Sequence, residues 1–337
     1  MLFRSYVDGS LEVTKKTVTI TADSDTKVYD GTALTKNSYT NTDLAEGDSI
    51  DSVTVTGSQT VAGTSDNVPS AAKIVNAAGE DVTASYKITY ANGTLEVTKK
   101  EITISTGSDS KPYDGTPLTN SEATITGLVD GETVTLKATG TITEVGNTTN
   151  SYSIEWDKAD AGNYKITEKL GTLTITKNDT AITLTAATAS KTYDGSALTD
   201  STVTVDGLPE GFTYEATASG SQTDAGSSNN TVDNGFKIFD KDGNDKTENF
   251  TNVKTVPGTL TVNAKEVTIT TGSYSKPYDG TPLTNDEVNI TGLVDGESVT
   301  LTATGTITDV GSTENSYSIK WDNAKAKNYT VDRKSVV

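Results

Sequence analysis

The chain of 337 residues contains no cysteine and no histidine. These absences exclude disulfide bonds, thiol nucleophiles, serine–histidine triads, and zinc or haem sites that depend on Cys or His ligands. We therefore expect no catalytic, cofactor-binding or metal-ligating residues, and we interpret the chain as a protein that is not an enzyme.

Positive charge and long apolar runs are also scarce. The chain has 27 Lys and Arg against 46 Asp and Glu, which gives a formal net charge of −19. A surface this acidic repels phosphate backbones and anionic lipid headgroups. No apolar run approaches the roughly 18 residues that a membrane-spanning helix requires. The sequence therefore argues against nucleic-acid partners and against membrane insertion.

Glycine and β-branched residues are abundant. The chain contains 29 glycines, and threonine alternates with valine or isoleucine in many segments, for example 17–20 and 102–105. β-branched residues favour strands, and successive side chains of a strand point to opposite faces of the sheet. The alternation predicts half-buried strands throughout the chain and hence an all-β protein.

A nine-residue motif, Lys-x-Tyr-Asp-Gly-(Thr/Ser)-x-Leu-Thr, occurs four times, with its tyrosines 84, 80 and 85 residues apart. The tyrosines are Tyr29, Tyr113, Tyr193 and Tyr278. A second marker, Gly-(Ser/Thr)-Leu-x-(Val/Ile), begins at Gly9, Gly93, Gly171 and Gly258. A repeat of this length is long enough for a small domain with its own core, unlike the shorter units of open solenoids.

The repeats alternate between two types, which we call A and B. The second and fourth repeats share Ser-Lys-Pro-Tyr-Asp-Gly-Thr-Pro-Leu-Thr-Asn, whereas the first and third share Gly-Ser-Gln-Thr-x-Ala-Gly. We predict four modules in the order A-B-A-B, at residues 17–98, 99–177, 178–263 and 264–337. Residues 1–16 are interpreted as the trailing strand of a preceding repeat or as residues added at the terminus, and the fourth module lacks its closing Gly-Thr-Leu-x-Val strand.

Each module is predicted to be a small antiparallel β-sandwich of the Ig-like type, with a β-grasp-like arrangement as the alternative. Asn92-Gly93 lies between the alternating segments 86–90 and 95–97, which predicts a hairpin. Residues 98–101 form a short linker that contains no flexible Gly-Ser segment. We therefore expect a stiff, extended rod with small contacts between modules.

The Lys-x-Tyr-Asp-Gly-Thr motif with its trailing Gly-Thr-Leu-x-Val strand resembles the YDG and MBG-type repeats of large bacterial cell-surface, adhesin-like proteins. The resemblance covers nearly the whole chain, four times over. It implies an extracellular location on the bacterial cell surface or cell wall, and a non-enzymatic stalk or adhesin segment.

The motif tyrosines and the two tryptophans are candidates for a ligand site. We interpret each motif tyrosine as a core residue at a strand end before a tight turn, because Asp caps its own backbone and Gly adopts positive φ. Trp156 and Trp321 share strand faces with Ile154 and Ile319. Core positions are therefore favoured over platforms for stacking sugars.

Acidic clusters raise the question of metal binding and catalysis. Residues 240–245 resemble the start of a calcium loop, but Asp245 stands where the turn needs Gly and Thr251 where a bidentate Glu belongs. We predict a solvated hairpin turn there, no cofactor, and at most weak Ca²⁺ binding. Asp130 and Glu132 lie on an acidic turn with no convergent partner visible in the sequence.

Surface stalks also carry Lys–Asn isopeptide crosslinks in some cases. Lys111 with Asn163, and Lys276 with Asn328, are the candidate pairs here. Nothing in their spacing distinguishes them from exposed residues.

Three functions are open from the sequence. The first is a stalk or spacer that projects a terminal domain of a bacterial surface adhesin from the cell, and the second is a multivalent module that binds a glycan or host protein. In the third, the chain is a head-to-tail filament subunit, in which the apolar strand with Leu11 and Val13 completes the last module of another copy. The alternative to that exchange is a frayed start and a last strand formed from residues 331–337. The expected partners are neighbouring repeats, a glycan or host protein, and a second copy.

Overall fold

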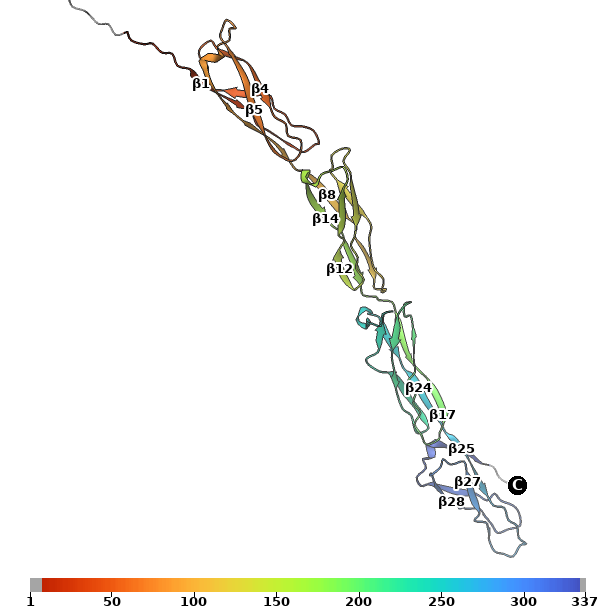
Figure 1. Ribbon diagram of the computed structural model, residues 1–337. Coiled ribbons are helices and arrows are strands. Elements are labelled where there is room, and N and C mark those ends of the chain that lie inside the picture. The colour runs from red at the N-terminus through yellow and green to blue at the C-terminus, as the bar shows by residue number, and fades with distance from the viewer. Residues whose placement is uncertain (1–7, 334–337) are drawn as a thin grey trace, which may run out of the picture. The chain divides into compact units, whose positions relative to one another are not determined.

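The computed structural model describes residues 8–333, and it is all-β, as predicted (Figure 1). Its only helical segments within this range are single 3₁₀ turns, one in each repeat: Thr83–Ser85, Ala161–Asn163, Thr247–Asn249 and Ala326–Asn328. Among the described residues, no helix has the length and apolar character needed to cross a membrane. The expectations for residues 1–7 and 334–337 lie outside the described range.

The described residues divide into two compact units. The first contains residues 8–111 and 117–175, and the second contains residues 112–116 and 176–333. The first two repeats therefore form the first unit, apart from the motif loop 112–116 of the second repeat. That loop belongs to the second unit together with the third and fourth repeats.

The first repeat contains two sheets. One has the order β3-β1-β6 and the other β2-β7-β5-β4. The strands are β1 (Lys16–Ala22), β2 (Asp25–Val28), β3 (Tyr39–Asn41), β4 (Ser49–Thr56), β5 (Gly63–Val75), β6 (Tyr86–Ala91) and β7 (Gly93–Thr98). Strands β1 and β6 are parallel, and so are β2 and β7, whereas the other pairs are antiparallel. The sheets are thus mixed, where the sequence pattern predicted antiparallel pairing alone.

The second repeat follows the same plan, with sheets of order β10-β8-β14, β12-β15-β9 and β11-β13. Its strands are β8 (Lys100–Thr106), β9 (Asp109–Pro112), β10 (Ala123–Thr126), β11 (Val134–Ala138), β12 (Gly146–Thr149), β13 (Tyr152–Trp156), β14 (Tyr164–Lys169) and β15 (Thr172–Thr176). The central strand β8 again pairs with β14 in parallel.

The third repeat has sheets of order β18-β16-β23, β17-β24-β21-β20 and β19-β22. Its strands are β16 (Ile182–Ala186), β17 (Ala189–Thr192), β18 (Val203–Asp206), β19 (Thr213–Glu215), β20 (Ala218–Ser219), β21 (Gly226–Val232), β22 (Lys237–Phe239), β23 (Val253–Val256) and β24 (Gly258–Asn263).

The fourth repeat keeps one of the two main sheets, β27-β25-β31, beside the pairs β26-β29 and β28-β30. Its strands are β25 (Lys265–Thr271), β26 (Leu283–Thr284), β27 (Val288–Thr291), β28 (Val299–Ala303), β29 (Thr306–Ile307), β30 (Tyr317–Trp321) and β31 (Tyr329–Arg333). No described strand takes the place of β7, β15 or β24.

The hairpin predicted at Asn92-Gly93 is wrong. Strand β6 pairs with β1, whereas β7 pairs with β2 and β5 in the other sheet, so the chain crosses between sheets at this point. Gly93 is required there for a different reason: a Cβ atom on it would lie 2.4 Å from the carbonyl oxygen of Asp23. The glycine of the second sequence marker therefore permits a close crossing of two chain segments.

The cores follow the alternating pattern. In the first repeat, Val18, Ile74 and Tyr86 are buried in one cluster that joins the two sheets. A buried asparagine adds a polar anchor, since the Asn67 amide donates to the carbonyl oxygens of Asp23 and Lys36 at 2.9 and 2.8 Å. Asn150, Asn230 and Asn315 make the same pair of bonds in the other repeats. The core of each repeat thus contains one amide that ties two loops together.

Candidate functional site: the tyrosine joints between repeats

The Lys-x-Tyr-Asp-Gly motif forms a self-contained loop that presents its tyrosine. In the first repeat, Lys27 Nζ lies 2.7 Å from Asp30 Oδ1 and donates to the carbonyl oxygen of Thr32 at 2.6 Å. Asp30 also accepts the Thr32 backbone N–H at 2.8 Å, and Gly31 adopts a φ of +80°. The bond to the Lys27 ammonium, followed by those from Thr32, holds the pKa of Asp30 well below its usual range. The expected tight turn is confirmed.

The tyrosine of this loop is buried by the next repeat. Tyr29 donates its hydroxyl to Glu132 Oε1 at 2.5 Å, and Tyr164 donates to the other oxygen of Glu132 at 2.5 Å. The two rings meet edge to face with their centroids 5.7 Å apart. One carboxylate therefore bridges two tyrosines from different repeats, and charge-assisted bonds of this kind are stronger than neutral ones.

An apolar cluster surrounds the bridge. Leu34 and Val97 from the first repeat, and Ile102 and Tyr164 from the second, are buried in one continuous cluster with Tyr29. Strand β7 ends at Thr98 and β8 begins at Lys100, so a single residue connects the two repeats. The apolar cluster is thus continuous from one repeat to the next. The expectation of small contacts between modules is wrong for this joint.

A backbone contact completes the joint. Ala62 N–H of the first repeat donates to Asn163 Oδ1 of the second at 2.8 Å, and Asn163 is buried. Asn163 lies in the 3₁₀ turn directly before Tyr164, so one short segment supplies both the amide and the aromatic ring.

Burial and the shared carboxylate change the acidity of the two tyrosines. Burial, together with the bond to Glu132, raises the pKa of Tyr164 to about 12. The hydrogen bond to Glu132, and then burial, raises the pKa of Tyr29. Both hydroxyls therefore remain protonated donors at neutral pH.

The second unit contains the same joint between the third and fourth repeats. Tyr193 and Tyr329 both donate to Glu297, and their rings meet edge to face at 5.6 Å. Ala225 N–H donates to Asn328 Oδ1 at 2.7 Å, as Ala62 does to Asn163.

An ion-pair cluster is added to this second joint. Asp224 of the third repeat lies 2.8 Å from Lys325 Nζ and 3.0 Å from Lys327 Nζ, and it accepts the Asn328 amide at 3.0 Å. The bond from Lys325, then those from Asn328 and Lys327, holds the pKa of Asp224 well below its usual range. Val61 occupies the matching position of the first repeat, so the first joint lacks these charges.

The motif loop of the second repeat uses aromatic rings instead of a carboxylate. Within the second unit, Tyr113 contacts Phe212 and Phe250, with centroids 5.8 and 6.2 Å away. Its backbone is held by Thr176 and Asn178: the Tyr113 N–H donates to Thr176 O at 2.8 Å, and the Asn178 amide donates to Tyr113 O at 2.8 Å. Phe212 and Phe250 occupy the positions of Glu132 and Tyr164 in the second repeat.

The predicted core position is wrong for the fourth motif tyrosine, Tyr278. Tyr278 is 67% exposed, although its loop is formed: Lys276 bonds Asp279 and Thr281, as Lys27 and Lys191 bond the matching residues of the first and third repeats. The motif tyrosines of the other repeats are all buried, Tyr113 to 1% exposure. A repeat therefore presents its motif tyrosine by itself, but the burial comes from residues outside the repeat.

The tryptophans lie behind the joints. Trp156 stacks on Tyr164 with centroids 5.9 Å apart, and Trp321 stacks on Tyr329 at 5.6 Å. Both are partly buried against the joint clusters, in line with the predicted core positions. A tyrosine therefore occupies one face of each indole ring.

The candidate isopeptide pairs are not brought together. Asn163 and Asn328 bond the backbone of the preceding repeat, whereas Lys111 and Lys276 bond their own motif loops. Each side chain thus has another partner.

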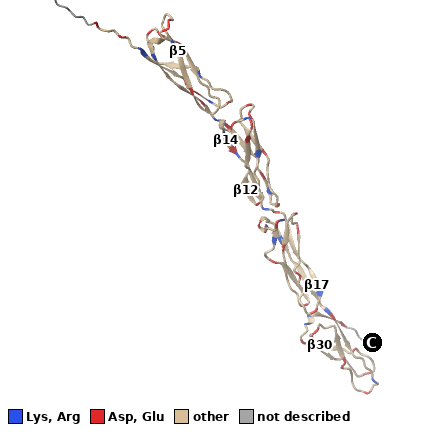
Figure 2. Ribbon diagram, viewed as in Figure 1, with Lys and Arg blue, Asp and Glu red and all other residues tan. Residues whose placement is uncertain are grey.

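The acidic segment 240–245 forms a turn, as predicted. Asp240 Oδ1 accepts the backbone N–H groups of Asp242 and Asn244 at 2.9 Å each. Within residues 8–333, no three His, Cys, Asp or Glu side chains are grouped as metal ligands. Charged residues are spread over all four repeats (Figure 2).

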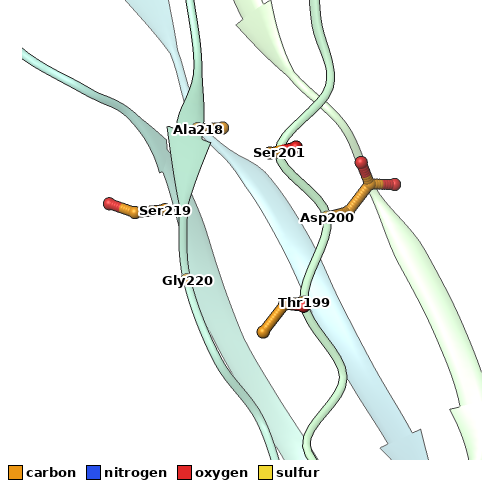
Figure 3. Close-up of a pocket in the computed structure, with 6 residues that line it drawn as sticks. All are labelled: Thr199, Asp200, Ser201, Ala218, Ser219 and Gly220. Atoms are coloured by element: carbon orange, nitrogen blue, oxygen red, sulfur yellow. The ribbon is translucent and has the colours of Figure 1, made fainter.

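A shallow hollow in the third repeat offers little for a ligand. It is lined by the segments Thr199–Ser201 and Ala218–Gly220, and the Asp200 carboxylate points away from the second segment (Figure 3). Asp200 instead accepts the Thr202 N–H at 2.9 Å. Small side chains and main chain line the hollow, without convergent polar groups of the kind that ligand sites use.

The sequence does not predict that Glu132 and Asn163 take part in the joints. The sequence places Glu132 on an acidic turn without a convergent partner, and the structure corrects this, because two tyrosines converge on it. Asn163 stands out in the sequence only as a crosslink candidate. A carboxylate placed the same distance after the Thr-Gly-Leu-Val-Asp-Gly segment in both B repeats is the one feature that points to the bridge.

The fold and these joints define a tandem-repeat protein of small all-β modules with built contacts between repeats. Residues 98–171 and 263–336 match the YDG domain family. The second and fourth repeats are therefore YDG-type repeats. No curated protein matches the chain in sequence.

Proposed function

We propose that the chain is a structural spacer: a stalk segment of a bacterial surface adhesin, in which tyrosine joints hold successive repeats together and project a terminal domain from the cell. The observation that carries this proposal is the bridge from Tyr29 to Tyr164 through Glu132, repeated with Tyr193, Glu297 and Tyr329. A joint built twice from the same residue types supports a mechanical role better than a unique recognition site does.

The connections between repeats support the same role. One residue separates β7 from β8, and one residue separates β24 from β25. Flexible tethers instead contain Gly-Ser-rich segments that behave as random coils. Short connections and a shared core restrict bending at the joint.

Small-angle scattering of the full chain tests the proposal. Four modules of about 33 Å each, set in line with their linkers, give a maximum dimension on the order of 140 Å. A value below roughly 90 Å, by the same strand-rise arithmetic, contradicts a stiff spacer. The double variant Tyr29→Ala/Tyr193→Ala should broaden the distance distribution, because both bridges lose a partner.

A glycan array separates the spacer from the binding module. A spacer should give no specific hits on immobilised glycans. Specific binding that disappears on substitution of a single loop would instead favour the recognition role.

A further inference from the structure

The first and last strands of the first repeat run side by side in the same direction. Strand β1 pairs in parallel with β6, residues 16–21 lying beside residues 86–91. Strand β2 pairs in parallel with β7 in the other sheet, residues 25–28 lying beside residues 95–98. In both ladders the partners are 70 positions apart in the chain. The two segments therefore form one continuous parallel pair that keeps its register from one sheet to the other.

One hydrogen bond closes the gap between the two ladders. Ser24 Oγ accepts the backbone N–H of Thr94 at 2.9 Å, and these residues are also 70 positions apart. The second and third repeats make the same bond, from Thr172 N–H to Ser108 Oγ at 2.9 Å and from Thr259 N–H to Thr188 Oγ1 at 3.1 Å. A bond from a serine or threonine of the first segment thus joins the ladders at the point where the chain changes sheets.

The third repeat, which has a repeat before it and another after it in the chain, contains the same pair. Residues 182–185 of β16 lie parallel to residues 253–256 of β23. Residues 189–192 of β17 lie parallel to residues 260–263 of β24, and these two strands are labelled side by side in Figure 1. The partners are 71 positions apart throughout. The chain enters this repeat at one end of the pair and leaves it from the other end.

The direction of the pairing decides how tension along the chain acts on the hydrogen bonds. In an antiparallel pair, the N-terminus of one strand and the C-terminus of the other lie at the same end, so pulling on them opens the bonds one after another. In a parallel pair these termini lie at opposite ends, and the same pull slides one strand along the other. Tension that enters at the first segment and leaves at the last therefore loads all bonds of the pair together.

We propose that the repeats bear tension, and that the continuous parallel pair of first and last segments, here called the clamp, is the element that resists it. The clamp is also packed: Ile182, Leu184, Leu260 and Val262 of the third repeat are each at most 1% exposed. Sliding the segments past each other has to move these side chains through a close-packed core, which adds to the barrier. The inference rests on the proposed stalk role, because only a chain held at both ends carries tension.

Single-molecule force spectroscopy of the full chain tests the clamp by changing the direction of pulling. The chain has no cysteine, so two introduced cysteines define where the force is applied. Asp179→Cys with Asn263→Cys pulls on opposite ends of the clamp of the third repeat, whereas Asp179→Cys with Lys254→Cys pulls on one end of it. All three positions are exposed. The first pair should need about twofold more force or higher, because its bonds break together. Equal forces in the two directions overturn the proposal.

Matched substitutions separate the clamp from general stability, because forced unfolding follows the barrier to unfolding. Thr188→Ala removes the acceptor that joins the two ladders of the third repeat. Thr217→Ala is the control, an exposed threonine of the same repeat that donates to Asp233 at 2.7 Å outside the clamp. With the cysteines at positions 179 and 263, Thr188→Ala should lower the unfolding force and Thr217→Ala should leave it unchanged. Equal effects of the two substitutions contradict a clamp that runs through the crossing.

Force spectroscopy and small-angle scattering distinguish the failure of this inference from the failure of the spacer. A chain that scatters as an extended particle, but unfolds at the same force in both pulling directions, contradicts the clamp and leaves the spacer intact. A chain that scatters as a compact particle, but needs more force along the clamp than across its end, contradicts the spacer and supports the clamp.

Discussion

Tyr113 and Tyr278 stand in the same eleven-residue sequence, yet one is 1% exposed and the other 67%. The loop is formed in both repeats, with Gly115 and Gly280 at φ of +76° and +77°. The difference lies in what covers the ring: Phe212 and Phe250 pack on Tyr113, and no other described aromatic ring packs on Tyr278. The motif therefore encodes the presentation of a tyrosine, and a neighbouring repeat supplies its burial.

The largest expected difference comes from truncating the two tyrosines. Tyr113→Ala should lower the free energy of unfolding of the second unit by about 3–5 kcal/mol, the range for a buried aromatic side chain. Tyr278→Ala should change it by less than about 0.5 kcal/mol, as an exposed substitution does. Denaturant unfolding, monitored by hydrogen exchange, measures the change in the free energy of unfolding for both variants. Equal losses would show that the two rings are equally buried.

The bridge through Glu132 allows a second comparison, between two acidic residues of the first unit. Glu132→Ala should destabilise this unit by about 2–3 kcal/mol, because two buried hydroxyls lose a charged acceptor. Asp130→Ala, two residues away and exposed, is the matched control and should have little effect. Trp156 stacks on Tyr164, so its fluorescence in a Trp321→Phe background reports on the joint. Similar losses for the two variants would contradict the bridge.

Alkaline pH should weaken the joints that contain a carboxylate. The folded pKa of Tyr164 lies near 12 against an ordinary value of 10.0, so the folded state holds its proton more tightly than the unfolded state. Its contribution is complete below pH 10 and is lost as the pH rises toward 12. The slope is about 1.4 kcal/mol per pH unit for each such tyrosine. Unfolding at a series of pH values, with Tyr164→Phe as control, measures it.

Added salt should also distinguish the two bridged joints, and this is the smallest of the expected effects. Asp224 with Lys325 and Lys327 adds surface ion pairs to the second unit, and salt screens exposed charges. Added salt should lower the melting temperature of the second unit slightly, and Asp224→Asn should remove this dependence. The first unit, with Val61 at the matching position, provides the reference. Equal salt dependence in the two units would exclude a role for these ion pairs.

The sequence predicts much of the repeats themselves. Period-two alternation locates the strands, and the Asp-Gly step locates the motif turn, because both depend on neighbouring residues only. The parallel pairing of β1 with β6 and the crossing at Gly93 are not predicted, because these contacts join residues that are far apart in the chain.

The joints are less accessible to sequence reasoning for the same reason. Tyr29 and Glu132 are 103 residues apart, and nothing local indicates that one donates to the other. The shared motif suggests one environment for all four tyrosines, whereas Tyr113 and Tyr278 show that identical local sequence leaves burial undetermined.

Chemical accessibility of the tyrosines tests the central claim most directly. Nitration of the full chain, at a concentration where it is a single chain, can be quantified residue by residue by mass spectrometry. Tyr278 should react at the rate of the exposed Tyr274, whereas Tyr113 should be protected, and Phe212→Ala with Phe250→Ala should expose Tyr113 without unfolding the second repeat. Equal reactivity of Tyr113 and Tyr278 in the wild-type chain, or continued protection of Tyr113 in the variant, would contradict burial by a neighbouring repeat.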